Sequence, residues 1–509
     1  MSICIIFHYN KKRYGSGEQE GGQTVSDRLK KVFILHTNDI HSHFEEMPQI
    51  AGMLNRLRAE RKGADIVTVD IGDHIDRANA ISEGTMGAAN VAIMNAAGYD
   101  FAVPGNNEGL TLLPSELADA YSGGKFRALC ANLSLTDTGA PPPWLKPYAI
   151  VEKGGLRIGF IGVTAAFTQF YRLIGWEATD PFEAVACTIH ELLPHTDVRV
   201  VLSHLGIQND RKLAESIPGI DVIIGGHTHH LLEKPEQIGN TYLFAAGKFG
   251  KYVGVVELSY ETGTRQLAGV DGTCYPCLDA APDPGTETII RQQKRLSDDV
   301  LHAPVCRLDH ALPVDWQSES ALGNLLAAGL KRHTGAEIGL VNSGQILESL
   351  LPGVVTKEAL HRMCPSPINP CLTLLSGEDI RQALEESLLP EFYLKRITGY
   401  GFRGYMLGGL SVDGMQVQFD PEGKPYQKIL HLAVNGEPLE PDRLYRVGTI
   451  DMFTFIIGYT TLARGSATQF FLPEFIRDLM ATELQKDSSV RNSLRLDRWQ
   501  QINRERSIT

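Results

Sequence analysis

Six short apolar segments recur between residues 31 and 260, and each of them ends in polar residues or glycine. They are VFILHTND, DIVTVDIGD, FAVPGNNE, LRIGFIGVT, VRVVLSHLG and DVIIGGHTH. Apolar runs of this kind are typical of strands that are covered on both faces of a sheet. Between them lie segments such as residues 50–62, which carry apolar side chains at helical spacing. The alternation predicts a layered α/β architecture for the first half of the chain.

The chain of 509 residues is too long for one ordinary hydrophobic core. The segment DAAPDPGTETIIRQQKR, residues 279–295, combines a Pro/Gly/Asp loop with a polar helix and is typical of a linker. Beyond it, Ser376 and Asp379 have capping-box spacing ahead of an amphipathic helix. We therefore predict a polar N-terminal tail over residues 1–30, an α/β domain over 31–280, a linker with a helix over 281–304, and a smaller α+β domain over 305–500.

Composition argues against several kinds of partner. A net charge of −12 disfavours binding to a nucleic acid polymer, which needs clustered Lys and Arg. No apolar run is long enough to span a bilayer, and ICIIF near the start is shorter than a secretory signal requires. Eight cysteines are sparse, which fits a reducing compartment, and the lone C-x-x-C of Cys274 and Cys277 is interpreted as incidental. We expect a cytoplasmic protein with no membrane contact; the sequence does not indicate its oligomeric state.

Polar side chains gather where the predicted strands end. Ligands bind at the carboxyl ends of strands in open α/β sheets, so these side chains are expected to meet. Carboxylate, amide and imidazole donors without thiolate suit manganese, zinc, iron or magnesium. The pattern predicts a site for two divalent ions, with one carboxylate bridging. The seven candidate ligands are Asp39, His41, Asp73, Asn106, His204, His227 and His229.

The ordered motifs D-x-H, GD, GN, SH and GHTH resemble those of the binuclear metallophosphoesterases. HTNDIHSHFE is similar to the amino-terminal domain of the bacterial 5′-nucleotidase and UDP-sugar hydrolase family. GLVNSG, PSPINP and LLSGEDIRQALEESL are similar to the carboxy-terminal substrate domain of that family. The resemblance implies a four-layer α/β/β/α metallophosphoesterase domain followed by a smaller α+β 5′-nucleotidase C-terminal domain.

The resemblance also implies how the ligands divide. One metal would be held by Asp39, His41 and His229, and the other by Asn106, His204 and His227, with Asp73 bridging. Two cations about 3.5–4 Å apart bind phosphate oxygens and lower the pKa of a shared water. His43 is a candidate to orient a ligand, and His230 has no assigned role.

The chain departs from the family at the residue after Asn106. The family carries a histidine there, paired with an aspartate, and this chain carries Asn107 and Leu110. An imidazole that protonates the leaving oxygen is worth about 10²–10⁴ in rate. Three hypotheses follow: Asn107 still hydrogen-bonds the phosphoryl group, His74 replaces the imidazole, or the enzyme is weakened or restricted to good leaving groups.

GDHIDR resembles the GD-x-x-DR signature of phosphoprotein phosphatases. There the arginine, here Arg77, contacts phosphate; a surface arginine on the following loop is the alternative interpretation. The two-domain resemblance outweighs this motif and favours a nucleotide over a phosphoprotein as the substrate.

The second domain departs from the family as well. In NSGQILES, Asn342 and Gly344 match the family's substrate-binding stretch, but Gln345 and Leu347 replace a glycine and a phosphate-binding arginine. Arg396 or Arg403 is expected to compensate with a planar donor fork. Phe402 is predicted to stack on the nucleobase, and Phe453, Phe455 and Tyr459 are the other aromatic candidates.

These observations predict a metal-dependent phosphohydrolase that binds a small nucleotide between its domains. Hydrolysis of nucleoside 5′-monophosphates is the leading activity. Hydrolysis of 2′,3′-cyclic nucleotides or of UDP-sugars is the alternative within the class. A catalytically impaired nucleotide-binding or sensing protein is the alternative outside it.

Overall fold

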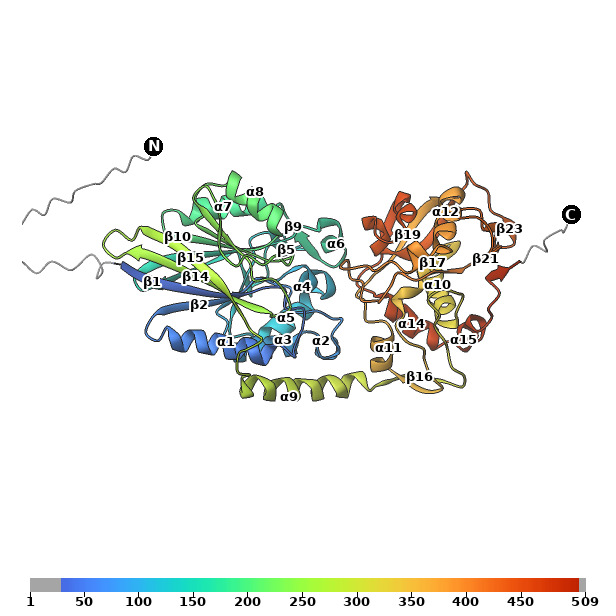
Figure 1. The fold of residues 1–509 in the computed structure, drawn as a ribbon, viewed down its shortest axis with the longest axis horizontal. Helices are drawn as coiled ribbons and strands as arrows, with labels where there is room; N and C mark the ends of the chain where they lie inside the picture. Colours follow the sequence, from blue (N-terminus) through green and yellow to red (C-terminus); the bar gives the residue numbers. More distant parts are fainter. Residues whose placement is uncertain (1–28, 503–509) are drawn as a thin grey trace, which may run out of the picture.

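Two domains joined by a long helix make up residues 29–502, the part of the chain that the computed structural model describes (Figure 1). The polar tail predicted for residues 1–30 lies outside this range, except that Leu29 and Lys30 begin strand β1 (Leu29–Thr37). Figure 1 shows the two domains side by side, with the connecting helix α9 (Pro284–Leu301) running along the lower edge of the first domain toward the second.

The first domain contains two large sheets. In the first sheet, β1 lies between antiparallel β14 and parallel β2. The strands of this sheet in spatial order are β15 (Leu267–Pro276), β14 (Tyr252–Glu261), β1, β2 (Asp65–Asp70), β3 (Phe101–Ala102), β4 (Arg127–Leu129) and β6 (Leu145–Lys146). Those of the second sheet are β12 (Glu236–Ile238), β13 (Thr241–Phe244), β11 (Val222–Gly225), β10 (Val198–His204), β8 (Leu156–Thr164) and β7 (Tyr148–Lys153).

The two sheets pack face to face through β-branched and aromatic side chains. Val32 and Val67 of the first sheet share one buried cluster with Ile158 and Val200 of the second. Helices cover the outer faces: α1 (Met47–Glu60), α3 (Ala88–Ala97) and α5 (Pro114–Ser122) on the first sheet, and α7 (Pro181–Leu192) and α8 (Ile207–Ser216) on the second. The predicted α/β/β/α order of layers is confirmed.

Helix α9 begins where its sequence provides a cap. The carboxylate of Asp283 accepts the backbone N–H of Thr286 at 2.7 Å, and Pro284 occupies the first turn. Along its length α9 packs against α2 (Ala80–Thr85), where Ser297 Oγ donates to the carbonyl of Ala80. The helix therefore rests on the first domain and leads into the second.

The second domain is built around α10 (Ala321–Thr334), which is buried along most of its length. A five-stranded sheet packs on it, in the order β20 (Leu410–Asp413), β17 (Ile338–Asn342), β24 (Leu444–Ile450), β19 (Pro370–Ser376) and β25 (Ser466–Phe470). A four-stranded sheet lies beyond, in the order β23 (Glu437–Pro438), β22 (Ile429–Val434), β21 (Met415–Phe419) and β26 (Trp499–Gln501).

Five further helices surround these sheets: α11 (Lys357–Met363), α12 (Gly377–Ser387), α13 (Pro390–Tyr393), α14 (Ile476–Leu484) and α15 (Asp487–Ser493). The predicted cap of α12 is confirmed, because Ser376 Oγ accepts the backbone N–H of Asp379.

Candidate active site

Loops at the carboxyl ends of the strands bring the seven candidate ligands together. Asp39 and His41 follow β1, Asp73 follows β2, and Asn106 opens the short helix α4 (Asn106–Thr111). His204 ends β10, and the segment that follows β11 carries the remaining two. Two groups of converging donor atoms result, Asp39 with His41 and His229, and Asp73 with His204 and His227.

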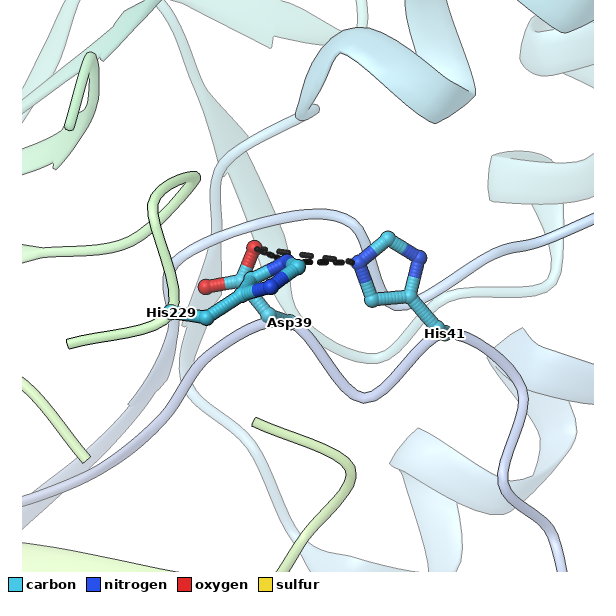
Figure 2. Close-up of side chains that lie close together, drawn as sticks. All are labelled: Asp39, His41 and His229. Carbon is cyan, nitrogen blue, oxygen red and sulfur yellow. Dashed lines mark hydrogen bonds and ion pairs between the residues drawn. The ribbon is translucent and has the colours of Figure 1, made fainter. Parts of the chain in front are cut away.

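The first group is drawn in Figure 2, where one carboxylate and two imidazole rings point toward one another. Asp39 Oδ1 lies 3.6 Å from His229 Nε2, and the Nε2 atoms of His41 and His229 are 3.2 Å apart. Two imidazole nitrogens and a carboxylate oxygen at these distances form a donor set that one divalent cation could share.

The second group lies next to the first. Asp73 Oδ1 is 3.3 Å from His204 Nε2, which in turn is 3.2 Å from Asn106 Oδ1. The other oxygen of Asp73 is 3.8 Å from His41 Nε2 in the first group. Asp73 therefore faces both groups, which is the position that a bridging ligand needs.

Backbone strain is concentrated at these residues. Non-glycine residues rarely adopt positive φ angles, and each such residue costs about 1–3 kcal/mol, which the surrounding structure must offset. Here φ is 52° at Asp39, 49° at His41, 52° at Asp73, 71° at His227 and 61° at His229. Strain at five of the seven candidate ligands is typical of functional sites.

A residue that sequence reasoning did not single out holds the loops in this shape. The buried carboxylate of Glu108 accepts backbone N–H groups of Asp73, Ile75 and Gly105 at 3.0, 2.7 and 2.9 Å. The two loops also approach too closely for a side chain at Gly105, where a Cβ atom would lie 2.4 Å from the nitrogen of Asp73. Glu108 stands two residues after Asn106, and this proximity was the only signal that could have identified it.

The donor set suits divalent cations. Asp39, Asp73 and His204 are almost fully buried, so their polar atoms have lost water. Burial disfavours the charged form of His204, but the Asp73 carboxylate outweighs burial and raises the pKa of His204 to about 10. Bound cations would stabilise the ionised carboxylates, which have lost most of their hydration in this site. The carboxylate and imidazole donors therefore fit a pair of divalent ions.

Asn107 lies at the centre of the site. Its backbone N–H donates to Asp73 Oδ1 at 2.8 Å, and its side-chain amide is 2.9 Å from Nδ1 of His41. It also lines the cavity described below. Its position suits the hypothesis that it contacts the phosphoryl group.

The structure does not bring His74 or Arg77 to the reaction site. His74 is buried in the core beside Tyr99, with Nδ1 3.2 Å from the side-chain amide of Asn90, and burial lowers its pKa to about 3. Arg77 donates to Glu83 at 2.8 Å and to the carbonyl of Thr111 at 2.7 Å. Neither side chain lines the cavity, so the structure does not support His74 as the replacement imidazole or Arg77 as the phosphate-binding arginine. Local spacing could not show that the loop turns these side chains inward.

A cavity of about 820 Å³ extends from the candidate ligands into the space between the domains. The first domain contributes Asn107, Phe167 and Phe170 beside five of the candidate ligands, which are His41, Asp73, Asn106, His227 and His229. The second domain contributes Asn369, Tyr400, Phe402, Arg403, Asp451 and Phe455. A volume of this size accommodates a small organic ligand.

Several residues predicted to bind substrate have other positions. Phe402 lines the cavity but is only 3% exposed, so packing rather than stacking on a ligand occupies its ring. Asn342 is buried and donates to the carbonyl of Leu407 at 2.6 Å, and a Cβ atom at Gly344 would lie 2.0 Å from a backbone oxygen. These two residues therefore shape the loop behind the cavity. Arg396 is exposed and does not line the cavity, whereas Arg403 does.

Two residues of the cavity wall were missed or ranked low. Tyr400 is 53% exposed and Phe455 is 37% exposed, and their ring centroids are 5.7 Å apart. Phe455 was one of four aromatic candidates, and the sequence offered no signal for Tyr400. Exposed aromatic rings at a cavity mouth are available for stacking in a way that Phe402 is not.

Comparison with known proteins follows the same division of the chain. Residues 34–231 match the calcineurin-like phosphoesterase family, and residues 300–463 match the family described as 5′-nucleotidase, C-terminal domain. An uncharacterized metallophosphoesterase of Bacillus subtilis (strain 168), YunD, is 37% identical over 459 residues, covering 89% of this chain and 99% of that protein. The 5′-nucleotidase of Rattus norvegicus is 23% identical over 486 residues, covering 82% of this chain and 81% of that protein.

Solved structures show the same two-domain fold. The NAD nucleotidase of Haemophilus influenzae aligns over 94% of this chain and 100% of its own, with a TM-score of 0.67 and 16% identity. A 5′-nucleotidase precursor from Thermus thermophilus aligns over 93% of this chain and 100% of its own, with a TM-score of 0.57 and 23% identity. The resemblance read from the sequence is confirmed. Within residues 29–502, none of the helices combines the length and apolar character that crossing a membrane requires.

Proposed function

Since the chain belongs to the calcineurin-like phosphoesterases that carry a 5′-nucleotidase C-terminal domain, and is thereby a hydrolase of phosphate esters, we propose that it converts nucleoside 5′-monophosphates to nucleoside and phosphate. The cytoplasmic location expected from composition stays a prediction. The observation that supports the proposed activity is the shared cavity, because candidate metal ligands line one of its walls and aromatic and polar groups of the second domain line the other.

The first wall would act on phosphate. When bound, two divalent ions neutralise phosphate charge and supply a nucleophile by lowering the pKa of water. Asp73 lies between the two donor groups and would hold both ions. The side-chain amide of Asn107 lies beside these groups and would donate a hydrogen bond to a phosphoryl oxygen, which helps to orient the phosphorus for attack.

The second wall would bind the nucleoside. Tyr400 and Phe455 present exposed rings, and stacking on a nucleobase is worth about 1–3 kcal/mol per base. Phe170 of the first domain stacks on Phe455 at 5.7 Å between ring centroids. The aromatic surface thus continues across both domains and would place a base at one end of the cavity, opposite the candidate metal ligands.

Asp451 would bind the sugar. It begins the short helix η3 (Asp451–Phe455), so its carboxylate lies one turn from the ring of Phe455 on the same wall. Its Oδ1 atom has no hydrogen-bond partner among residues 29–502. A buried acceptor without a partner is costly, and a ribose hydroxyl reaching into the cavity would supply the missing donor.

The proposal is tested with the purified chain and added Mn²⁺. The substrates are AMP, a 2′,3′-cyclic nucleotide, a UDP-sugar and bis-para-nitrophenyl phosphate, with product identity determined by chromatography. We expect AMP to give the highest kcat/KM and a chelator to abolish turnover. A higher kcat/KM for the cyclic nucleotide or the UDP-sugar would replace the proposed substrate. AMP binding without turnover of any of the four would identify a nucleotide-binding protein instead.

A further inference from the structure

Arg403 crosses the boundary between the domains to reach a carboxylate of the first domain. Its Nη2 atom donates to Asp76 Oδ2 at 2.6 Å. The arginine is fixed in the second domain, because its backbone N–H donates to the buried Ser366 Oγ at 3.1 Å. A charge-assisted hydrogen bond of this length is among the stronger contacts that two side chains form.

Asp76 in turn contacts a candidate metal ligand. The same oxygen that accepts from Arg403 lies 3.3 Å from Nδ1 of His41. The other ring nitrogen, Nε2, faces Asp39 and His229 in the first donor group. A carboxylate on the far nitrogen of a metal-binding histidine fixes the tautomer and the ring orientation and makes the imidazole a better ligand.

The position of Asp76 depends on the arginine. Its side chain is 5% exposed, and a buried carboxylate needs a charged partner. Within the first domain it accepts one further bond, from the backbone N–H of Ala78 to Oδ1 at 2.8 Å. The positively charged partner of Oδ2 is therefore the guanidinium of Arg403, which belongs to the second domain.

We propose that Arg403 is a positioning residue for the metal centre: by holding Asp76 against His41, the second domain sets the affinity of the first domain for its metal ions. This role differs from a direct contact of Arg403 with substrate phosphate, which the cavity lining also permits. It goes beyond the proposed activity, since it concerns cation binding with no nucleotide present.

The direction in which cation affinity changes when Arg403 is removed distinguishes this role from a purely electrostatic effect of its charge. Arg403 carries a positive charge near the cation site, so removing it would relieve repulsion and strengthen cation binding if charge alone mattered. Loss of the support for His41 instead weakens binding, typically by about 10–100-fold when an outer partner of a metal ligand is lost. A residue that contacts only substrate would leave cation binding unchanged.

The test is calorimetric titration of Mn²⁺ into the full-length chain after chelation and dialysis. We expect Arg403→Met and Asp76→Asn each to raise the Kd for Mn²⁺ about 10-fold or more. Because both act through one contact, the double variant should bind no more weakly than Asp76→Asn alone. Arg403→Lys keeps the charge without the planar fork and should fall between wild type and Arg403→Met.

The matched control is Arg464→Met, which removes an exposed arginine that pairs with Asp379 inside the second domain. It should leave the Kd for Mn²⁺ within about 2-fold of wild type, because it lies outside the chain of contacts that supports the metal ligands. Unchanged or tighter binding by Arg403→Met would overturn the proposal, as would an equal loss in the control. Arg403 is partly exposed, so Arg403→Met remains informative even where Asp76→Asn does not fold. Since no nucleotide is present, failure of the proposed activity would not alter this outcome.

Discussion

The side-chain amide of Asn107 lies 2.9 Å from Nδ1 of His41, and its backbone N–H lies 2.8 Å from Asp73 Oδ1. Its side-chain oxygen also receives the amide of Asn106 at 3.3 Å. A single residue thus touches three candidate ligands drawn from both donor groups. Asparagine in this place both supports the ligands and faces the cavity, but it has no proton to give to a leaving group.

Replacing Asn107 by histidine tests the consequence for leaving groups. Because imidazole can protonate a departing oxygen, the variant should gain most on AMP, whose leaving alkoxide is poor, and least on para-nitrophenyl phosphate. We expect the ratio of kcat for AMP to kcat for para-nitrophenyl phosphate to rise about 10-fold or more. Asn107→Ala should lower kcat on both substrates by about 10²-fold, as loss of a transition-state donor does. Equal changes of Asn107→His on both substrates would show that protonation does not limit the rate.

The exposed aromatic residues of the second domain lead to a separate prediction about binding of the nucleobase. Phe455→Ala should raise KM for AMP by about 5–100-fold, the equivalent of one lost stacking contact, because the base loses its platform. KM for para-nitrophenyl phosphate should change less, since that substrate lacks a nucleobase. Phe402→Ala should instead lower the midpoint of thermal unfolding, because the ring is buried in the core of the second domain. Equal effects of Phe455→Ala on both KM values would remove Phe455 from the nucleobase site.

The candidate metal ligands could be predicted from sequence because each lies at the end of a recognisable strand or within a few residues of it. Strand ends in a parallel sheet meet at one edge, so order along the chain fixes proximity. The next residues could not be predicted. His74 and Asp76 stand two apart in GDHIDR, yet the loop turns His74 into the core and Asp76 toward His41. Which side of a strained loop a residue occupies depends on packing, and no local pattern encodes it.

Residues of the second domain were harder to predict for a different reason. Tyr400 and Asp451 reach the cavity only because two domains dock, and the chain places them more than 300 residues from Asp73. Phe402 was predicted to stack on the base because flanking glycines indicated an exposed loop, but its ring is buried. The same glycines let the loop fold tightly over its own phenylalanine: a Cβ at Gly404 would lie 2.4 Å from the ring of Phe402.

Asp451 should make stability depend on pH. Burial raises its pKa from 3.8 to about 7, so the native state binds this proton more tightly than the unfolded chain. Stability from this group is therefore fully present below about pH 4 and is lost as the pH rises to about 7. Asp451→Asn cannot ionise, so it avoids the loss of stability that deprotonation of Asp451 causes. The variant should therefore have a higher thermal midpoint than wild type at pH 8, but not at pH 4.

The neighbouring titratable group does not interfere, because burial first and Asp451 second raise the pKa of the Cys371 thiol and keep it neutral over this range. The control is Asp442→Asn, the same change at an exposed position. It should shift the midpoint equally at pH 4 and pH 8. If Asp451→Asn behaves in the same way as Asp442→Asn, the buried carboxylate does not titrate as described.

Cation binding should stabilise the fold by mass action. Ions that bind only the native state add about 2.7 kcal/mol at a concentration 100 times the Kd. Adding Mn²⁺ to the chelated protein should therefore raise the thermal midpoint, and Asp73→Ala should abolish most of the rise because Asp73 faces both donor groups. The control is His230→Ala, which changes an exposed residue beside the candidate ligand His229 but outside the cavity lining, and it should keep the rise in thermal midpoint. An undiminished rise in Asp73→Ala would refute the two-ion arrangement.

Glu83 should hold the domains together. It lies 2.7 Å from Arg477 of the second domain and 2.8 Å from Arg77 of its own, and all three side chains are largely buried. Burial would raise the pKa of Glu83, but Arg477 and then Arg77 lower it to about 2. Its contribution to stability is thus present above about pH 4.5 and is lost as the pH falls toward 2.

Glu83→Gln leaves two guanidinium groups buried without their counter-charge, and breaking such a pair costs about 3–5 kcal/mol. We expect unfolding of the variant in urea at pH 7 to begin at a lower concentration than in wild type, with the difference shrinking below pH 4. Glu287→Gln removes an exposed pair with Arg291 on α9 and should cost no more than about 0.5 kcal/mol. Equal stability of the two variants would mean that the ion pairs of Glu83 do not stabilise the contact between the domains. Apolar contacts such as Phe170 against Phe470 would then hold the domains together around the cavity.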